Sequence, residues 1–564
     1  MGTLDWVVIG IFFLALIGII VWVVKQKQND SADYFLGGRD ATWLAIGASI
    51  FASNIGSEHL IGLAGAGASS GMAMAHWEIQ GWMILILGWV FVPFYTRSMV
   101  YTMPEFLERR YNPQSRTILS VISLVSYVLT KVAVTVYAGG LVFQQVFGIK
   151  ELWGIDFFWI AAIGLVVLTA LYTIFGGMKS VLYTSVLQTP ILLLGSLIIL
   201  VLGFKELGGW DEMMRVCGAV TVNDYGDTMT NLIRSNDDAN FPWLGALIGS
   251  AIIGFWYWCT DQFIVQRVLS GKNEMEARRG TIFGAYLKLL PVFLFLIPGM
   301  IAFALHQKYI GAGGEGFLPM LANGTANADA AFPTLVAKLL PAGVKGLVVC
   351  GILAALMSSL ASLFNSSAML FTIDFYKRFR PETPEKKLVG IGQVATVVIV
   401  ILGILWIPIM RSVGDVLYTY LQDVQSVLAP GIAAAFLLGI CWKRTSAQGG
   451  MWGLIAGMVI GLTRLGAKVY YSNAGEVADS TFKYLFYDMN WLFFCGWMFL
   501  FCIIVVIVVS LATKAPTAEK IQGLVFGTAT KEQKAATRAS WNHWDIIHTV
   551  IILAITGAFY WYFW

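Results

Sequence analysis

The chain has 564 residues, of which 58% are hydrophobic and only 12% are charged, with a formal net charge of +4. A soluble protein of this length needs far more charge to cover its surface, and no basic patch is interleaved with aromatic residues, so neither a soluble fold nor a nucleic-acid partner is expected. Apolar runs of about 20 residues, the length that crosses a bilayer as a helix, recur along the chain. The expected fold class is an all-α membrane protein whose surroundings are the lipid bilayer.

These runs predict about fourteen transmembrane helices. Asp5 rather than a basic region opens the first run, and Lys25 and Lys27 follow it, which favours a retained helix with its N-terminus outside over a cleaved signal. Alternating loops then place most Lys and Arg residues on the cytoplasmic side of a multi-pass plasma-membrane protein, with both termini extracellular or periplasmic. The predicted helices are 4–24, 43–71, 77–98, 115–147, 156–175, 180–205, 241–267, 281–307, 344–372, 389–410, 414–440, 449–472, 488–512 and 544–563.

The predicted helix 43–71 carries a polar interruption. Residues 52–59 (ASNIGSEH) place five polar side chains and a glycine in its middle. A continuous helix would bury these groups against lipid, whereas local unwinding lets them line a cavity and frees backbone carbonyls as ligands for a small cation. The alternative is a kinked helix packed through its small residues.

The predicted helix 344–372 carries oxygen ligands at helical spacing. Ala355, Ser358 and Ser359 are spaced i, i+3 and i+4, so they share one helix face. Two hydroxyls and a carbonyl facing the unwound segment would suit sodium, a hard cation that prefers oxygen. The alternative is that these small residues serve tight helix packing.

Directional hydrogen-bonding groups recur inside the apolar runs. The binding site of a polyol needs both hydrogen-bond donors and acceptors, together with an aromatic surface on which the solute can lie. Residues 256–258 (WYW) could supply this aromatic surface. The alternative is that they belong to an aromatic belt at the membrane interface. Lys131, Lys288 and Arg464 also lie within predicted helices, where each faces a cavity or partner, or else extends its charge to an interface. The candidate polar groups of the solute site are Asn54, His59, Glu78, Lys288 and Gln422.

Several motifs together resemble one family of transporters. Residues 52–59 (ASNIGSEH), 256–262 (WYWCTDQ), 358–362 (SSLAS), 102–106 (TMPEF) and 442–444 (WKR) are similar to the sodium/glucose (galactose) cotransporter branch of the solute:sodium symporter family. The resemblance covers nearly the whole chain. It implies a LeuT-like 5+5 inverted-repeat core, each repeat beginning with a discontinuous helix. The implied parts are a leading helix and linker at 1–42, repeats at 43–205 and 241–440, an extracellular loop at 206–240, and three C-terminal helices in 441–564 with a cytoplasmic linker at 513–541.

The resemblance also implies roles for particular residues. Sodium would be bound by the carbonyls of Ala52, Ile55 and Ala355 and by the hydroxyls of Ser358 and Ser359. The solute would contact Asn54, His59, Glu78, Lys288 and Gln422, with Tyr257 stacked on it as an inner gate. The other gate residues would be Trp77, Tyr418 and Trp258.

Three positions depart from the family pattern. Gly254 stands where relatives often have a polar, solute-contacting side chain, which predicts a roomier and less selective pocket. Ser185 and Ala361 stand where members that move two sodium ions have a carboxylate and a hydroxyl. We therefore expect one sodium per solute.

The expected function is sodium-coupled uptake of a small neutral sugar of the glucose or galactose type by alternating access. Inositol, sialic acid, a carboxylate and an amino acid stay open as alternative solutes. A channel would need repeated rings of like residues, and an enzyme a nucleophile–base or metal constellation, and neither pattern is present in the sequence. Sodium is the one cofactor expected, no organic cofactor is expected, and the oligomeric state is open.

Overall fold

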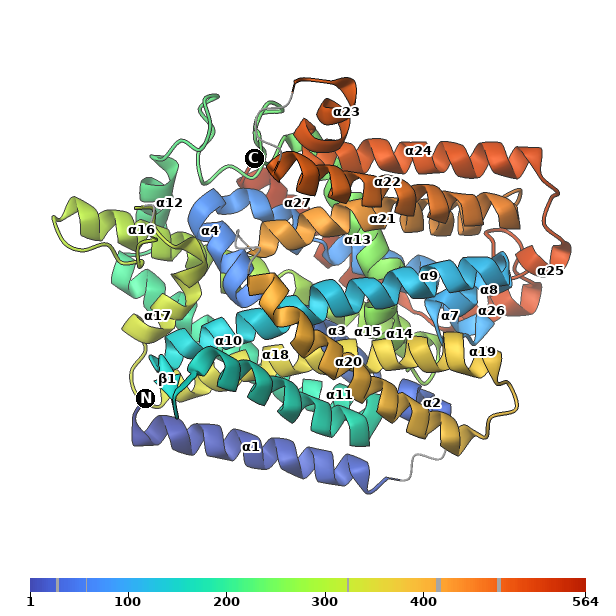
Figure 1. The fold of residues 1–564 in the computed structure, drawn as a ribbon, viewed down its shortest axis with the longest axis horizontal. Helices are drawn as coiled ribbons and strands as arrows, with labels where there is room; N and C mark the ends of the chain where they lie inside the picture. Colours follow the sequence, from blue (N-terminus) through green and yellow to red (C-terminus); the bar gives the residue numbers. More distant parts are fainter. Residues whose placement is uncertain (27–29, 57, 322–323, 412–416, 474–477) are drawn as a thin grey trace.

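The computed structural model describes residues 1–26, 30–56, 58–321, 324–411, 417–473 and 478–564, with the backbone alone for 129–130, 145, 409–411, 417–421 and 472–473. Figure 1 shows the long helices running mostly along one direction, with α1 (Thr3–Val24) at one edge and α24 (Trp491–Ala512) at the other. The described residues contain one antiparallel hairpin, β1 (Glu151–Leu152) and β2 (Ile155–Asp156).

The other α-helices are α2 (Ser31–Leu36), α3 (Trp43–Asn54), α4 (Ala64–Ser70), α5 (Ala75–Glu78), α6 (Gly81–Ile86), α7 (Val92–Ser98), α8 (Met103–Arg110), α9 (Pro113–Ser126), α10 (Ala133–Phe147), α11 (Phe157–Leu207), α12 (Trp210–Gly218), α13 (Trp243–Gly254), α14 (Gln262–Leu269), α15 (Glu274–Lys288), α16 (Ile297–Gly311), α17 (Ala331–Leu339), α18 (Val344–Met369), α19 (Lys377–Phe379), α20 (Glu385–Arg411), α21 (Leu417–Cys441), α22 (Ala447–Asn473), α23 (Thr481–Lys483), α25 (Ala518–Ile521), α26 (Lys531–Ala539) and α27 (His543–Tyr562). The π-helical segments that matter below are η2 (Glu58–Leu63), η5 (Tyr127–Val132) and η6 (Phe255–Thr260).

The predicted membrane-spanning pattern is confirmed. Within the described residues, 11 helical stretches are long and apolar enough to cross a membrane, and two shorter apolar helices accompany them. The number of stretches is smaller than the number of predicted helices because some stretches, such as Glu58–Ser98 and Phe157–Leu207, each contain parts of two predicted segments. Every predicted segment overlaps a described helix. The protein is therefore an all-α, multi-span membrane protein.

The longest helix, α11, joins two predicted segments through a break at Gly177. Its backbone adopts φ 52° and ψ −148°, a region that side chains with a Cβ avoid. A Cβ at Gly177 would lie 2.4 Å from the carbonyl oxygen of Tyr34 in α2. The glycine thus allows the chain to turn between two spans while α2 packs directly against the turn.

Two helices are interrupted near the centre of the molecule. Helix α3 ends at Asn54, Ile55 is extended with φ −80° and ψ 106°, and the chain resumes as η2 and α4. In the second half of the chain, α13 and η6 end before Asp261, which is extended with φ −76° and ψ 127°, and α14 follows. Helix α21 contacts both η2 and η6, so it lies against both breaks.

Candidate functional site

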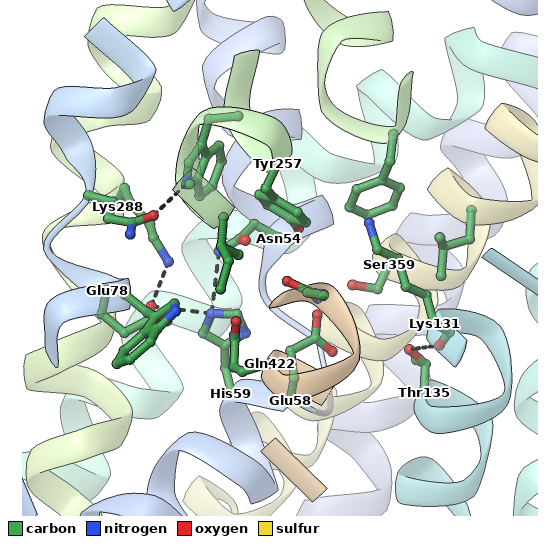
Figure 2. Close-up of a pocket in the computed structure, with 18 residues that line it drawn as sticks. Asn54, Glu58, His59, Glu78, Lys131, Thr135, Tyr257, Lys288, Ser359 and Gln422 are labelled. Atoms are coloured by element: carbon green, nitrogen blue, oxygen red, sulfur yellow. Dashed lines mark hydrogen bonds and ion pairs between the residues drawn. The ribbon is translucent and has the colours of Figure 1, made fainter. Parts of the chain in front are cut away.

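A cavity of about 50 Å³ lies where the two broken helices meet α5, α15, α18 and α21. Figure 2 shows side chains from these elements converging on it. Three of its walls are the π-helical segments η2, η5 and η6, a distortion that is frequent at functional sites. The predicted solute-contacting and gate residues that line the cavity are Asn54, His59, Trp77, Glu78, Tyr257, Trp258, Lys288 and Gln422.

Glu78 and Lys288 form the charged centre of one wall. Lys288 Nζ donates to Glu78 Oε2 at 2.6 Å, and both side chains are buried. His59 Nε2 lies 3.2 Å from the same carboxylate oxygen and 3.4 Å from the amide nitrogen of Asn54. These four residues form one connected network of donors and acceptors at the cavity wall, as Figure 2 shows.

Trp77 and Gln422 each bring an unbonded polar atom to the cavity. Trp77 Nε1 is a buried donor and Gln422 Oε1 a buried acceptor, and neither has a hydrogen-bond partner in the described part of the chain. Buried polar groups in native proteins are nearly always bonded. The two atoms therefore mark positions where a ligand with both acceptors and donors would complete the hydrogen bonding.

The break in the first helix meets α18 at Ser359. Its Oγ donates to the Ser53 carbonyl at 2.7 Å and lies 3.4 Å from the Ile55 carbonyl oxygen. Ser358 lies toward α11 instead, with its hydroxyl 3.3 Å from that of Ser185. Of the two predicted sodium-binding hydroxyls, Ser359 thus faces the freed carbonyls and Ser358 faces a neighbouring helix.

The other predicted sodium ligands lie in the same buried region. Ala52 and Ile55 flank Asn54 at the end of α3, and Ala355 lies one helical turn before Ser359 in α18. All three are almost fully buried. The available atoms are neutral oxygens, which suits a monovalent hard cation.

Lys131 pairs with a residue that sequence reasoning missed. Its Nζ donates to Asp261 Oδ2 at 2.7 Å, at the break of the second helix, and Tyr127 donates to the other carboxylate oxygen. The ammonium also lies 4.7 Å from the ring centres of both Tyr257 and Phe263. Lys131 is buried, so the alternative that it extends to an interface is wrong.

Arg464 is likewise buried and bonded. Its guanidinium donates to the Met489 carbonyl at 2.7 Å and lies 4.0 Å from the ring centre of Phe494. It packs between C-terminal helices and is not among the residues lining the cavity. Extension of Arg464 to an interface is therefore wrong as well.

The predicted gate residues whose side chains are described each make an aromatic contact at the cavity. Trp77 stacks on Trp491 with ring centres 5.5 Å apart, and Tyr257 packs edge-on against Trp258 at 4.9 Å. The side chain of Tyr418, the remaining gate residue, lies outside the described residues. The gating roles themselves stay predictions.

The predicted extra room at Gly254 is wrong. The side chain of Gln80 lies over this glycine, and a Cβ at position 254 would be 2.5 Å from Gln80 Oε1. Sequence reasoning treated the missing side chain as space because nothing local shows which neighbour occupies it. It also missed Thr135 and Gln425 as cavity-lining residues, whereas Glu58, in the polar segment 52–59, lines the cavity as predicted.

Two broken helices whose interruptions meet at a buried polar cavity define a class of protein, the secondary transporters that bind their cargo at helix breaks. The chain belongs to the Sodium:solute symporter family, whose model matches residues 34–457. It is a sodium-coupled solute symporter, and sodium is a co-transported ion.

Similar proteins with curated names include two human cotransporters. The chain is 36% identical over 538 residues to human sodium/myo-inositol cotransporter 2, covering 93% of this chain and 79% of that protein. It is 36% identical over 550 residues to the human sodium/myo-inositol cotransporter, covering 93% and 76%. These relatives carry names other than the glucose or galactose cotransporters that the motifs resembled.

A solved structure shows the same fold. A sodium-coupled sialic acid symporter in a substrate-bound, outward-open state superposes with a TM-score of 0.73 at 22% identity, covering 92% of this chain and 99% of that one. At this identity the likeness concerns the fold alone. The LeuT-like core expected from the motifs is therefore confirmed.

Proposed function

We propose that this symporter takes up a neutral polyol of the inositol type together with sodium. The observation that carries the proposal is the pair of unbonded buried atoms at the cavity, the donor Trp77 Nε1 and the acceptor Gln422 Oε1. A hydroxyl is both donor and acceptor, so a ring bearing many hydroxyls satisfies both atoms. The curated names of the relatives agree with this choice over glucose or galactose.

The charges around the cavity disfavour an acidic solute. Glu78 is paired with Lys288, and Lys131 is paired with Asp261. Glu58 also lines the cavity and makes no hydrogen bond or ion pair with any described residue. A carboxylate without a hydrogen-bonded partner of its own disfavours an anionic group placed next to it and tolerates a neutral polyol, since like charges at close range in a low dielectric repel.

Sodium binding at the first helix break would couple to the solute. The proposed ligands are the Ala52, Ile55 and Ala355 carbonyls with the Ser359 hydroxyl, and the Ser358 hydroxyl would turn from Ser185 to join them. Asn54 lies between two of these ligands and also lines the solute cavity, so an ion that fixes this backbone also fixes a solute contact. By linkage, the solute must then favour sodium by the same factor.

Alternating access would proceed by movement of the repeats, 43–205 and 241–440, around this fixed site, as in other transporters with inverted repeats. Both termini would lie outside a plasma membrane. Basic residues gather in and near α8, α19 and α26, at the end of the molecule away from both termini in Figure 1, and the positive-inside rule assigns such an end to the cytoplasm.

The test is solute uptake by the purified protein in liposomes, with an inward sodium gradient and with potassium in its place. The solutes are myo-inositol, glucose, galactose and sialic acid. We expect sodium-dependent uptake of myo-inositol, competed weakly by the hexoses and not by sialic acid. Sodium-driven uptake of sialic acid without uptake of any polyol would overturn the proposal.

A further inference from the structure

Gln80 occupies an unusual position between α5 and α6. Residues two apart on a regular helix do not face the same way. Here Ile79 and Gln80, with ψ near 23° and 24°, interrupt the helix, and both Glu78 and Gln80 line the cavity. The interruption therefore directs the Gln80 amide, which is buried, to the same cavity as the Glu78 carboxylate.

Two hydrogen bonds hold this amide in one orientation. Gln80 Nε2 donates to the Ser250 carbonyl of α13 at 2.8 Å, and Trp258 Nε1 donates to Gln80 Oε1 at 3.3 Å. A glutamine amide has two N–H groups and two acceptor lone pairs. One donor and one acceptor position of Gln80 thus remain for a further partner, in a fixed geometry.

Gly254 makes this placement possible. A Cβ at position 254 would lie 2.5 Å from Oε1, 2.9 Å from Cδ and 3.0 Å from Nε2 of Gln80, so the amide would have to shift to make room for it. Because both ends of the amide are bonded, it cannot move aside without losing a hydrogen bond. Gln80 and Gly254 are therefore complementary: the amide fills the volume that a larger residue at 254 would take.

We infer that Gln80 is a solute-recognition residue of this transporter, and that it hydrogen-bonds a hydroxyl of the neutral polyol from the wall where Gly254 offers no side chain. This inference rests on the proposed function and adds a specificity-determining residue to it. Glu78 and Gln80 would then hydrogen-bond adjacent hydroxyls on one side of the solute ring. One hydroxyl could use both remaining positions of Gln80: its oxygen would accept a hydrogen bond from the free N–H of Nε2, and its O–H would donate to the free lone pair of Oε1.

The experiment measures equilibrium binding of myo-inositol and its single-deoxy analogues to the purified full-length protein in sodium. Loss of one neutral hydrogen bond predicts that Gln80→Ala weakens myo-inositol binding roughly three- to tenfold. One deoxy analogue, lacking the hydroxyl that Gln80 contacts, should bind the wild type and Gln80→Ala equally. A purely structural role of Gln80 would weaken all analogues alike, and that result would overturn the inference.

Gly254 provides a second arm. Gly254→Ala should weaken binding in the wild type by displacing the amide, and should have little effect in the Gln80→Ala background. Equal effects of Gly254→Ala in both backgrounds would refute the complementarity. Gln393→Ala is the matched control, because Gln393 also donates from its amide to a helix carbonyl, that of Ile174 at 3.1 Å, away from the cavity. Its binding should equal that of the wild type.

The two conclusions fail separately. If the wild type binds no polyol but binds another solute, the proposed function fails. If the wild type binds myo-inositol and Gln80→Ala binds it and every deoxy analogue as tightly, only the inference about Gln80 fails. Stabilisation by sodium alone, measured as a rise in melting temperature, should be unchanged in Gln80→Ala, because the hydrogen bonds of this side chain to described residues go to Ser250 and Trp258, and neither is a proposed sodium ligand.

Discussion

At the scale of single residues, Glu78 and Lys288 show a functional use of buried charge. The free energy of removing two charged groups from water exceeds the free energy of their mutual attraction unless the geometry of the pair is good. A buried ion pair therefore contributes little to stability by itself. Here the pair also reaches His59 and faces the cavity. We therefore interpret it as a preformed set of charged hydrogen-bonding groups for the solute.

The Glu78–Lys288 pair predicts that removing both charges destabilises the protein less than removing one of them. Glu78→Gln leaves the Lys288 ammonium buried without its counter-charge, which should cost about 3–5 kcal/mol of stability. The double variant Glu78→Gln/Lys288→Met removes both charges and should recover most of that loss while solute binding stays weak. Thermal unfolding and binding of myo-inositol, measured on the same samples, check both halves. A double variant that binds as tightly as the wild type would contradict a role in recognition.

Ser359 predicts a change in sodium dependence. Ser359→Ala removes the hydroxyl that faces the Ser53 and Ile55 carbonyls. The half-saturating sodium concentration for uptake should rise roughly tenfold or more, as expected for loss of a ligand to a charged group. Folding should be nearly unchanged because alanine suits a helix.

Ser367→Ala is the control for Ser359→Ala. Ser367 is buried in the same helix, and its hydroxyl has no partner among the described residues. Its sodium curve should match that of the wild type. If Ser359→Ala also keeps the wild-type curve, the proposed sodium site is wrong.

At the scale of elements, the interruptions are held by specific contacts rather than left free. The second break is tied to η5 by Lys131 and Tyr127, which both bond the Asp261 carboxylate. The turn in α11 depends on Gly177, which allows α2 to approach. Each contact couples a break to an element distant in the sequence.

The Lys131–Asp261 pair predicts a measurable coupling. Lys131→Met and Asp261→Asn should each destabilise the protein because each leaves a buried charge unpaired. The double variant should be less destabilised than the sum, with a coupling of about 1–3 kcal/mol from a double-mutant cycle of thermal unfolding. Additive effects would show that the pair does not hold the break.

Gly177 predicts a large effect from a single methyl group. Gly177→Ala forces a strained backbone and places Cβ 2.4 Å from the Tyr34 carbonyl oxygen, so stability should fall by about 2 kcal/mol or more. Gly164 lies in the same helix with nothing within 4 Å of its Cβ position. Gly164→Ala should therefore be neutral or slightly stabilising, by up to about 1 kcal/mol. Comparable melting temperatures for the two variants would contradict the role of Gly177.

At the scale of the whole molecule, the sequence reveals the fold more fully than the site. Hydropathy is a property of each local segment, so the spans and the break at 52–59 could be predicted directly. The resemblance to the family predicted that Asn54, Glu78 and Gln422 contact one solute, and all three line the same cavity. Asp261 and Gln80 were missed because their roles depend on distant partners, Lys131 and Gly254, that no local pattern connects.

The number of ions per cycle is a property of the whole transporter. Ser185 and Ala361 provide no carboxylate for a second sodium, and Ser185 donates to the Val181 carbonyl at 2.6 Å. We expect one sodium per solute. One charge crossing about 100 mV gains about 2.3 kcal/mol, and a roughly tenfold sodium gradient adds about 1.4 kcal/mol, enough to concentrate a neutral solute on the order of 500-fold.

The reversal potential of the current in liposomes, with fixed sodium and solute gradients, gives this ratio directly. A value matching two sodium ions per solute would sink the one-sodium expectation. It would also point to a second sodium site built from residues other than those proposed.

The size of the cavity has a kinetic consequence. At about 50 Å³ it is far smaller than the roughly 300–1,000 Å³ of ordinary ligand pockets, so its walls must separate before a six-carbon ring can enter. Association that requires such a change is slower than diffusional encounter. Part of the attraction between protein and cargo is then consumed in prising the walls apart, which lowers affinity but makes loading and rearrangement a single event. A transporter built this way gives up tight capture, because part of its binding energy is used to keep the walls apart, and the contacts that the cargo makes with them stabilise the widened cavity.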